Sequence, residues 1–95
     1  MLLTKHDVLL VSATESEMPP SNIDGVMKLV TGVGMVATAY TLTRHLAHNK
    51  SKLVINLGIA GSFISELEIG SVVQVISDEF VELGVEDNGA FVPAD

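Results

Sequence analysis

Cysteine is absent from the 95 residues, which excludes disulfide bonds and thiol nucleophiles. Lysine and arginine number only 5 against 12 aspartate and glutamate residues, so the formal net charge is −7. Such an acidic chain suits neither nucleic acid nor an anionic membrane as a partner. No apolar run is long enough to cross a bilayer, and the first residues lack the apolar stretch of a signal peptide. We therefore expect a cytoplasmic protein that binds neither nucleic acid nor membrane.

The sequence does contain an apolar fraction of 47%, which suits the core of one small domain. Its central feature is residues 30–39, where an apolar run ends at Gly32 and Gly34 and a helical pattern begins. Glycine lets the backbone approach a ligand closely, and the following helix directs its free N–H groups at this turn. A second turn, with Gly58 and Gly61, closes the next apolar run. Two consecutive strands ending in glycine turns predict one ligand crevice at the carboxyl edge of an α/β sheet.

The apolar pattern also predicts the other elements. Strands are expected at residues 7–13, 25–30, 52–57 and 71–76, and residues 78–95 read as an acidic loop. The link between the first two strands is short for a parallel crossover, so either they pair antiparallel or part of the crossover has been lost.

A helix is expected from residue 36 to about residue 48, with Asn49 as a left-handed stop. Its predicted buried side is an apolar stripe at spacings of four, three and four. The stripe consists of Met35, Ala39, Leu42 and Leu46. Thr38, Thr41 and His45 are expected on other faces of this helix.

Two local patterns have a structural explanation beside a functional one. Gly32-x-Gly34-x-x-Ala37 matches the dinucleotide fingerprint, but the next strand ends at Leu57 without the carboxylate that holds ribose hydroxyls. A tight strand-to-helix turn also recruits glycine for structural reasons. His45-x-x-His48 offers two metal ligands, yet no third is evident and a solvated helix end explains the pair.

Glu15 and Glu17 directly follow the first predicted strand. A carboxylate that faces a glycine-lined crevice would have the low-dielectric surroundings that raise its pKa and suit a general acid or base. The alternative is an exposed loop glutamate. The residues alone leave both interpretations open.

Four ordered blocks together resemble the purine nucleoside phosphorylase and nucleosidase superfamily. They are residues 12–17, 31–38, 55–62 and 70–73. A further block at residues 77–91 resembles the futalosine hydrolase family within that superfamily. The resemblance implies an α/β fold, namely the N-terminal part of a three-layer α/β/α phosphorylase/hydrolase-like fold with a mixed, mainly parallel sheet. It also implies that residues 1–95 are the N-terminal part of a single nucleoside phosphorylase-like domain whose C-terminal half is absent.

The resemblance further implies a nucleosidase that cleaves the N-glycosidic bond of futalosine and releases hypoxanthine, in menaquinone biosynthesis. Glu17 aligns with the family glutamate that orients and activates water. Ile59, Ala60 and Gly61 align with the segment that lines the base and ribose, and Val33 aligns with an apolar contact near the 5′ side. The implied partner is a small-molecule nucleoside, with no cofactor or metal, and the full-length form is expected to be a homo-oligomer.

Several alternatives follow from the same residues. A phosphorylase is disfavoured, because residues 12–17 and Asn56 lack the arginines that hold phosphate in that branch. A methylthioadenosine or adenosylhomocysteine nucleosidase is the nearest alternative, disfavoured by residues 83–91. A non-catalytic nucleoside-binding remnant is the third. The family's general acid and ribose-binding glutamate lie in the other half, so the 95 residues alone are expected to be inactive.

Overall fold

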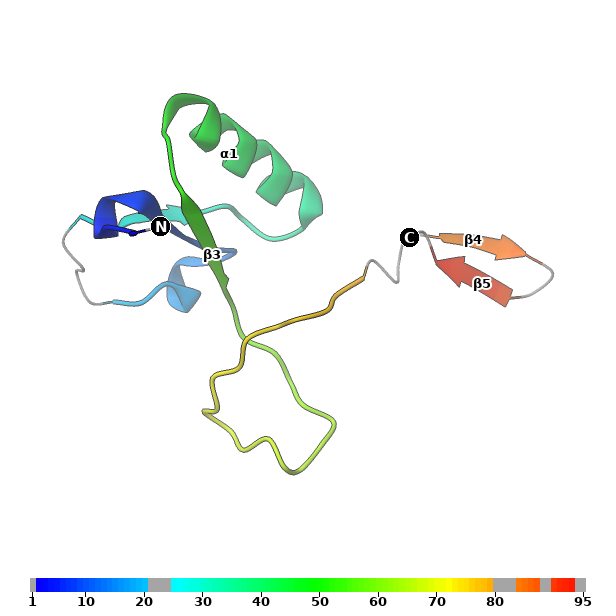
Figure 1. Ribbon diagram of the computed structural model, residues 1–95. Helices are drawn as coiled ribbons and strands as arrows, with labels where there is room; N and C mark the ends of the chain where they lie inside the picture. Colours follow the sequence, from blue (N-terminus) through cyan, green and yellow to red (C-terminus); the bar gives the residue numbers. More distant parts are fainter. Residues whose placement is uncertain (1, 21–24, 80–83, 88–89, 94–95) are drawn as a thin grey trace. The chain divides into compact units, whose positions relative to one another are not determined.

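The computed structural model describes residues 2–20, 25–79, 84–87 and 90–93 (Figure 1). The chain divides into two compact units, Met1–Gly61 and Ser62–Asp95. The first unit contains a three-stranded sheet and a long helix, and the second contains a two-stranded hairpin. The predicted site residues all belong to the first unit.

The sheet of the first unit is parallel, with strand order β2-β1-β3. The central strand is β1 (Val8–Ser12), and β2 (Met27–Val30) and β3 (Leu53–Leu57) flank it. The register pairs Ser12 with both Val30 and Leu57, so the three strands end at one edge. This shared carboxyl edge is where ligands bind in open α/β sheets.

The antiparallel alternative for the first two strands is wrong, because β1 and β2 pair in parallel. Residues 13–26 connect them and contain the short 3₁₀ helix η2 (Glu15–Glu17). A second 3₁₀ helix, η1 (Lys5–Asp7), precedes β1. A connection of roughly a dozen residues is enough for a parallel return.

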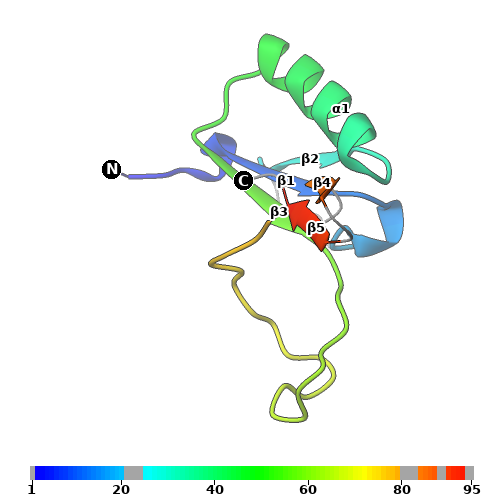
Figure 2. The ribbon, with the colours of Figure 1, turned by 90° about the vertical axis from the view of Figure 1, so that its right-hand side faces the viewer.

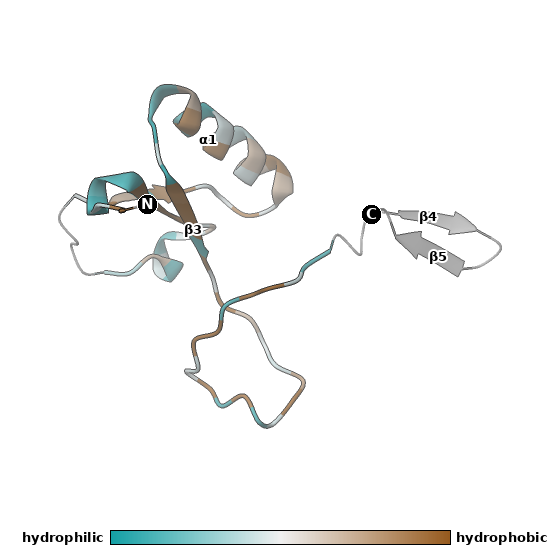
Figure 3. Cartoon of the chain, viewed as in Figure 1, coloured by the Kyte–Doolittle hydropathy of each residue, from teal (hydrophilic) through white to brown (hydrophobic). Residues whose placement is uncertain are grey.

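The core of the first unit is built around β1. Leu9 and Val11 are essentially fully buried, and Leu10 is nearly so. Helix α1 (Met35–His48) lies along one face of the sheet (Figure 2). Strand β3 is strongly hydrophobic (Figure 3), yet its residues Leu53 to Ile55 are more than a third exposed. In the described ranges no strand pairs with the outer edge of β3.

Helix α1 uses a partly polar face toward the end of β2, so the predicted apolar stripe is wrong. The Thr41 hydroxyl donates to the Thr31 carbonyl oxygen over 3.3 Å, and the hydroxyls of Thr31 and Thr38 lie 3.2 Å apart. Met35 and Leu46, the ends of the predicted stripe, are 48% and 40% exposed. The buried Thr31 hydroxyl needs hydrogen-bond partners, and the threonine face of α1 supplies Thr38 beside the carbonyl oxygens of Ser12 and Gly32.

The helix ends at His48 without a left-handed residue. Asn49 is extended, with φ −136° and ψ 135°, so the predicted left-handed stop is wrong. Its backbone N–H and its side-chain amide both donate to the His45 carbonyl oxygen, over 2.9 and 3.0 Å. The amide side chain helps to satisfy a terminal carbonyl, which a left-handed cap would otherwise do through the backbone.

The second unit differs from its prediction in two places. Strands β4 (Gly84–Asp87) and β5 (Ala90–Pro93) pair antiparallel where a loop was expected. The overlooked signal is the Asn88-Gly89 dipeptide between them, a strong hairpin sequence whose two residues lie outside the described ranges. The strand predicted at residues 71–76 does not form. A strand requires a hydrogen-bonded neighbour, and in the described part of the chain this segment pairs with none.

Candidate active site

Backbone hydrogen bonds to the end of β1 hold the first glycine turn. The N–H groups of Thr31 and Gly32 donate to the carbonyl oxygens of Ser12 and Ala13 over 2.9 and 3.1 Å. Gly32 and Gly34 have φ of +89° and +101°, a region that side-chain-bearing residues rarely adopt. The glycines therefore permit the chain to leave β2, turn at the carboxyl edge and enter α1.

The Glu17 carboxylate connects the segment after β1 with the turn after β3. Its Oε1 accepts a hydrogen bond from the Thr14 hydroxyl over 2.7 Å. Its Oε2 accepts one from the backbone N–H of Ile59, 42 positions along the chain, over 3.1 Å. A Cβ added to Gly58 would lie 3.3 Å from the same Oε2, so glycine suits this close approach. The fold thus brings together two residues that the sequence analysis singled out, Glu17 and Ile59.

These contacts determine the charge state of Glu17. The Thr14 hydroxyl, and after it the Ile59 N–H, hold the pKa of the Glu17 carboxyl below its usual 4.5, and desolvation only partly opposes them. The suggestion of a raised pKa is therefore wrong for this residue. At neutral pH Glu17 is a carboxylate, which can accept a proton from water or stabilise a cation but cannot act as an acid.

The remaining predicted ligand contacts lie on exposed loops at the same edge. Val33, between the two glycines of the first turn, is 77% exposed, and Ile59 is 88% exposed. Ala60 and Gly61 are exposed as well, and a Cβ built on Gly61 meets no atom within 4 Å. The structure does not bring Val33, Ala60 or Gly61 into contact with Glu17 by any hydrogen bond among the described residues. Their roles as base, ribose and 5′-side contacts stay predictions.

Thr14 is the residue that the sequence analysis did not single out. It carries the donor to Glu17, and its own carbonyl oxygen accepts the hydroxyl of the fully buried Ser12 over 2.8 Å. The available signal was the spacing Thr14-x-x-Glu17 directly after a buried strand. A hydroxyl and a carboxylate three positions apart lie on the same side of one helical turn.

No group of three metal-ligating side chains forms within the described ranges. His45 and His48 differ in burial, since His48 is exposed while Nε2 of His45 is buried without a hydrogen-bond partner in the described structure. Likewise, no helix among the described residues has the length and hydropathy to span a bilayer.

Residues 10–94 match the sequence profile of the Phosphorylase superfamily, which covers both glycine turns and Glu17. This chain belongs to the phosphorylase superfamily. Over 64 residues it is 41% identical to a 5′-methylthioadenosine/S-adenosylhomocysteine nucleosidase of Marinomonas sp. (strain MWYL1). That match covers 67% of this chain and 27% of the relative, so the chain spans about a quarter of the relative's length. No solved structure matches the chain.

The expected fold class is confirmed for this superfamily member, with three parallel strands and a helix in α/β arrangement. Despite the superfamily's name, the described segments at the carboxyl edge contain no cationic side chain for a phosphate. Residues 12–18, 31–34 and 58–61 contain no lysine or arginine. A bound phosphate dianion would have no charge-assisted partner among these segments.

Proposed function

We propose that this chain supplies the water-activating part of a nucleosidase that hydrolyses 5′-methylthioadenosine and S-adenosylhomocysteine. The observation that carries the proposal is the Glu17 carboxylate, charged and held at the carboxyl edge by Thr14 and Ile59. The substrate class comes from the 41% identical relative, whose name states that activity. Superfamily membership supports chemistry at an N-glycosidic bond.

In the proposed reaction the bond between the anomeric carbon and the purine nitrogen breaks, and its electron pair leaves with the base. The ribosyl group becomes cationic, and water forms the new bond to the anomeric carbon. Glu17 stabilises the cation and accepts the proton that the water loses. The leaving base takes up a proton from a group that we do not assign to a residue of this chain.

Hydrolysis is proposed in preference to phosphorolysis because of the charge at the edge. The charged side chains of residues 12–18, 31–34 and 58–61 are the carboxylates of Glu15 and Glu17, so phosphate would be repelled rather than bound. Water needs no such counter-charge. The expected sugar product is therefore the free thiopentose, and added inorganic phosphate should change neither the rate nor the product.

Futalosine is a second candidate substrate, favoured by one specific observation. Residues 77–91 resemble the corresponding block of futalosine hydrolases. Part of that block lies outside the described residues, and the described part belongs to the second unit. The identity to the methylthioadenosine-type relative is the reason for placing futalosine second.

A chromatographic assay of the protein encoded by the complete reading frame tests the proposal. 5′-Methylthioadenosine, S-adenosylhomocysteine and futalosine are supplied separately, with and without phosphate. Adenine release from the first two substrates is expected. Faster hypoxanthine release from futalosine would instead establish the second candidate, and a phosphate-dependent sugar phosphate would overturn hydrolysis.

The role of Glu17 is tested with Glu17→Gln and the matched control Glu15→Gln. Both residues belong to η2, but Glu15 is exposed and lies outside the Thr14–Ile59 hydrogen-bond arrangement. Loss of a general base typically costs about a hundredfold to ten-thousandfold in rate. We expect such a loss for Glu17→Gln alone. Equal activity of the two variants would contradict the assignment.

A further inference from the structure

The same sequence pattern, threonine followed three positions later by an acidic residue, occurs on both sides of β1. Thr4 and Asp7 precede the strand, and Thr14 and Glu17 follow it. In both pairs the threonine hydroxyl donates to the carboxylate, over 3.1 Å to Asp7 and 2.7 Å to Glu17. The two pairs therefore offer an internal comparison between the two edges of one sheet.

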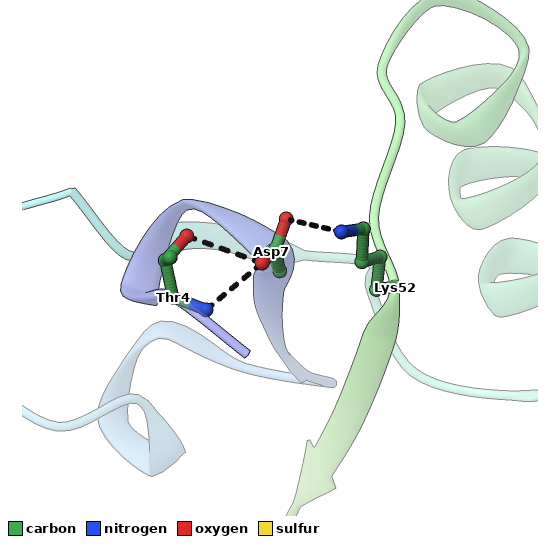
Figure 4. A network of polar contacts seen from close by, with 3 residues as sticks. All are labelled: Thr4, Asp7 and Lys52. Carbon is green, nitrogen blue, oxygen red and sulfur yellow. Dashed lines mark hydrogen bonds and ion pairs between the residues drawn. The ribbon is translucent and has the colours of Figure 1, made fainter. Parts of the chain in front are cut away.

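In the Thr4–Asp7 pair, the Asp7 carboxylate contacts both Thr4 and Lys52 (Figure 4). One oxygen of Asp7 accepts both the Thr4 hydroxyl and the Thr4 backbone N–H, the latter over 2.8 Å. Its other oxygen faces Lys52 Nζ at 3.8 Å, and the Asp7 carbonyl accepts the Lys52 N–H. These contacts fasten the start of β1 to the start of β3, which is a structural task.

The Thr14–Glu17 pair is arranged differently. In both pairs the backbone N–H of the acidic residue donates to the threonine carbonyl oxygen, so the difference lies at the carboxylates. The hydroxyl is directed to the carboxylate. Each carboxylate oxygen thus has its own donor, Thr14 for one and Ile59 for the other, and the two donors come from different strand ends.

Thr14 is itself anchored from the core. Ser12, the last residue of β1, is completely buried and donates its hydroxyl to the Thr14 carbonyl oxygen over 2.8 Å. The chain of contacts runs from a buried strand residue through the Thr14 backbone to its hydroxyl and on to Glu17. A side chain held through a buried anchor keeps its geometry without help from a ligand.

We propose that Thr14 is a positioning residue that orients the Glu17 carboxylate for the attack of water. This inference rests on the proposed nucleosidase function. Glutamate has three side-chain torsions, and two donors at separate oxygens restrict them in a way that one donor cannot. Without the Thr14 hydroxyl, Glu17 loses its shortest hydrogen bond and keeps contacts with backbone N–H groups, about which the carboxylate can rotate. Misplacement of a catalytic group by about 1 Å can cost roughly a hundredfold in rate.

Three variants of the complete protein separate positioning from simple stabilisation. Thr14→Val removes the donor and keeps the shape, while Thr14→Ser keeps the donor. Thr4→Val removes the equivalent hydroxyl-to-carboxylate bond at the opposite edge of the sheet. Two readouts are measured: kcat and KM for 5′-methylthioadenosine, and the titration of the Glu17 side-chain carboxyl by carbon-13 NMR.

Thr14→Val is expected to lower kcat about tenfold or more with little change in KM. It should also raise the pKa of Glu17 toward its usual 4.5. Thr14→Ser should restore both readouts, and Thr4→Val should alter neither. The proposal is overturned if Thr14→Val behaves like Thr4→Val, or if kcat falls while the Glu17 titration stays unchanged.

The two readouts also distinguish this inference from the function on which it rests. If the wild-type protein releases no adenine, the proposed substrate class fails. The NMR titration then still decides whether Thr14 holds Glu17, because it needs no substrate. If adenine is released but the Thr14→Val titration matches wild type, the function stands and the positioning role fails.

Discussion

Glu17 shows how one side chain can join segments that are distant in sequence. Its two oxygens bind the segment after β1 and the turn after β3, and both donors favour the charged form. Burial of a carboxylate usually raises its pKa, but direct hydrogen bonds to the charged form lower it. Here the hydrogen bonds prevail, so Glu17 is ionised at neutral pH, the form in which a carboxylate can accept a proton.

The lowered pKa makes the stability of the protein depend on pH in a definite direction. The folded-state pKa of Glu17 lies below the usual 4.5, so its ionised form contributes stability above that pH. This contribution is lost as the pH falls through the folded pKa. We expect the difference in unfolding free energy between wild type and Glu17→Gln to shrink below about pH 4.5, as measured by urea denaturation. A difference that grows on acidification would contradict the hydrogen-bond geometry.

Two glycines of the second turn should respond differently to substitution. A Cβ at Gly58 would lie 3.3 Å from the Glu17 carboxylate, so Gly58→Ala should shift that carboxylate and lower kcat. A Cβ at Gly61 meets nothing within 4 Å, so Gly61→Val should leave the fold intact. If Gly61 lines the ligand, the added side chain should occupy substrate space and raise KM. Steady-state kinetics and circular dichroism check both variants. A Gly61→Val enzyme with unchanged KM would count against a ligand contact there.

At the scale of the element, α1 contacts the end of β2 through hydroxyl groups. Thr38 and Thr41 contact Thr31 at the end of β2, next to the first glycine turn. The helix thereby fixes the turn that precedes it. His45 lies on the same helical face as Thr38 and Thr41, and its buried Nε2 has no hydrogen-bond partner in the described structure.

An unsatisfied buried polar atom costs about 1–3 kcal/mol. Leucine at position 45 would lack that nitrogen atom and would fill a similar volume with an apolar side chain. We expect His45→Leu to raise the free energy of unfolding by about 1 kcal/mol in chemical denaturation. The control His48→Leu alters an exposed ring in the same helical turn and should give no gain. Loss of stability in His45→Leu would show that Nε2 has a partner.

At the scale of the whole molecule, much apolar surface of the described residues is exposed. On α1, Val36 and Tyr40 are mostly exposed, and the outer edge of β3 has no strand partner in the described ranges. Such surfaces favour association with other protein. The match covers only 27% of the relative's length, and the relative is therefore a much longer protein than this chain.

We expect the isolated 95-residue chain to release no adenine from 5′-methylthioadenosine. Cleavage needs both a base for water and an acid for the leaving purine, and Glu17 is charged and serves only the first. Absence of a general acid costs about a hundredfold to ten-thousandfold. Chromatography against a buffer control measures the release. Clear release that depends on Glu17 would show that these 95 residues contain a sufficient site.

The positions of most elements in the first unit follow from the sequence. Periodicity and glycine placement are local properties, and they predicted β1, β3, α1 and the first glycine turn within a few residues. The resemblance of ordered blocks also predicted the superfamily. In the second unit the same reasoning was wrong, because an apolar segment at residues 71–76 becomes a strand only when a partner pairs with it.

Tertiary structure decided what local pattern could not. The parallel pairing of β1 with β2, the face that α1 turns to the sheet and the pKa direction of Glu17 all depend on distant residues. The Ile59 N–H reaches Glu17 only because parallel strands bring their carboxyl ends to one edge. The sequence determines that residue 17 is a glutamate. Its hydrogen-bond donors, and therefore its pKa and orientation, depend on the residues that folding places beside it.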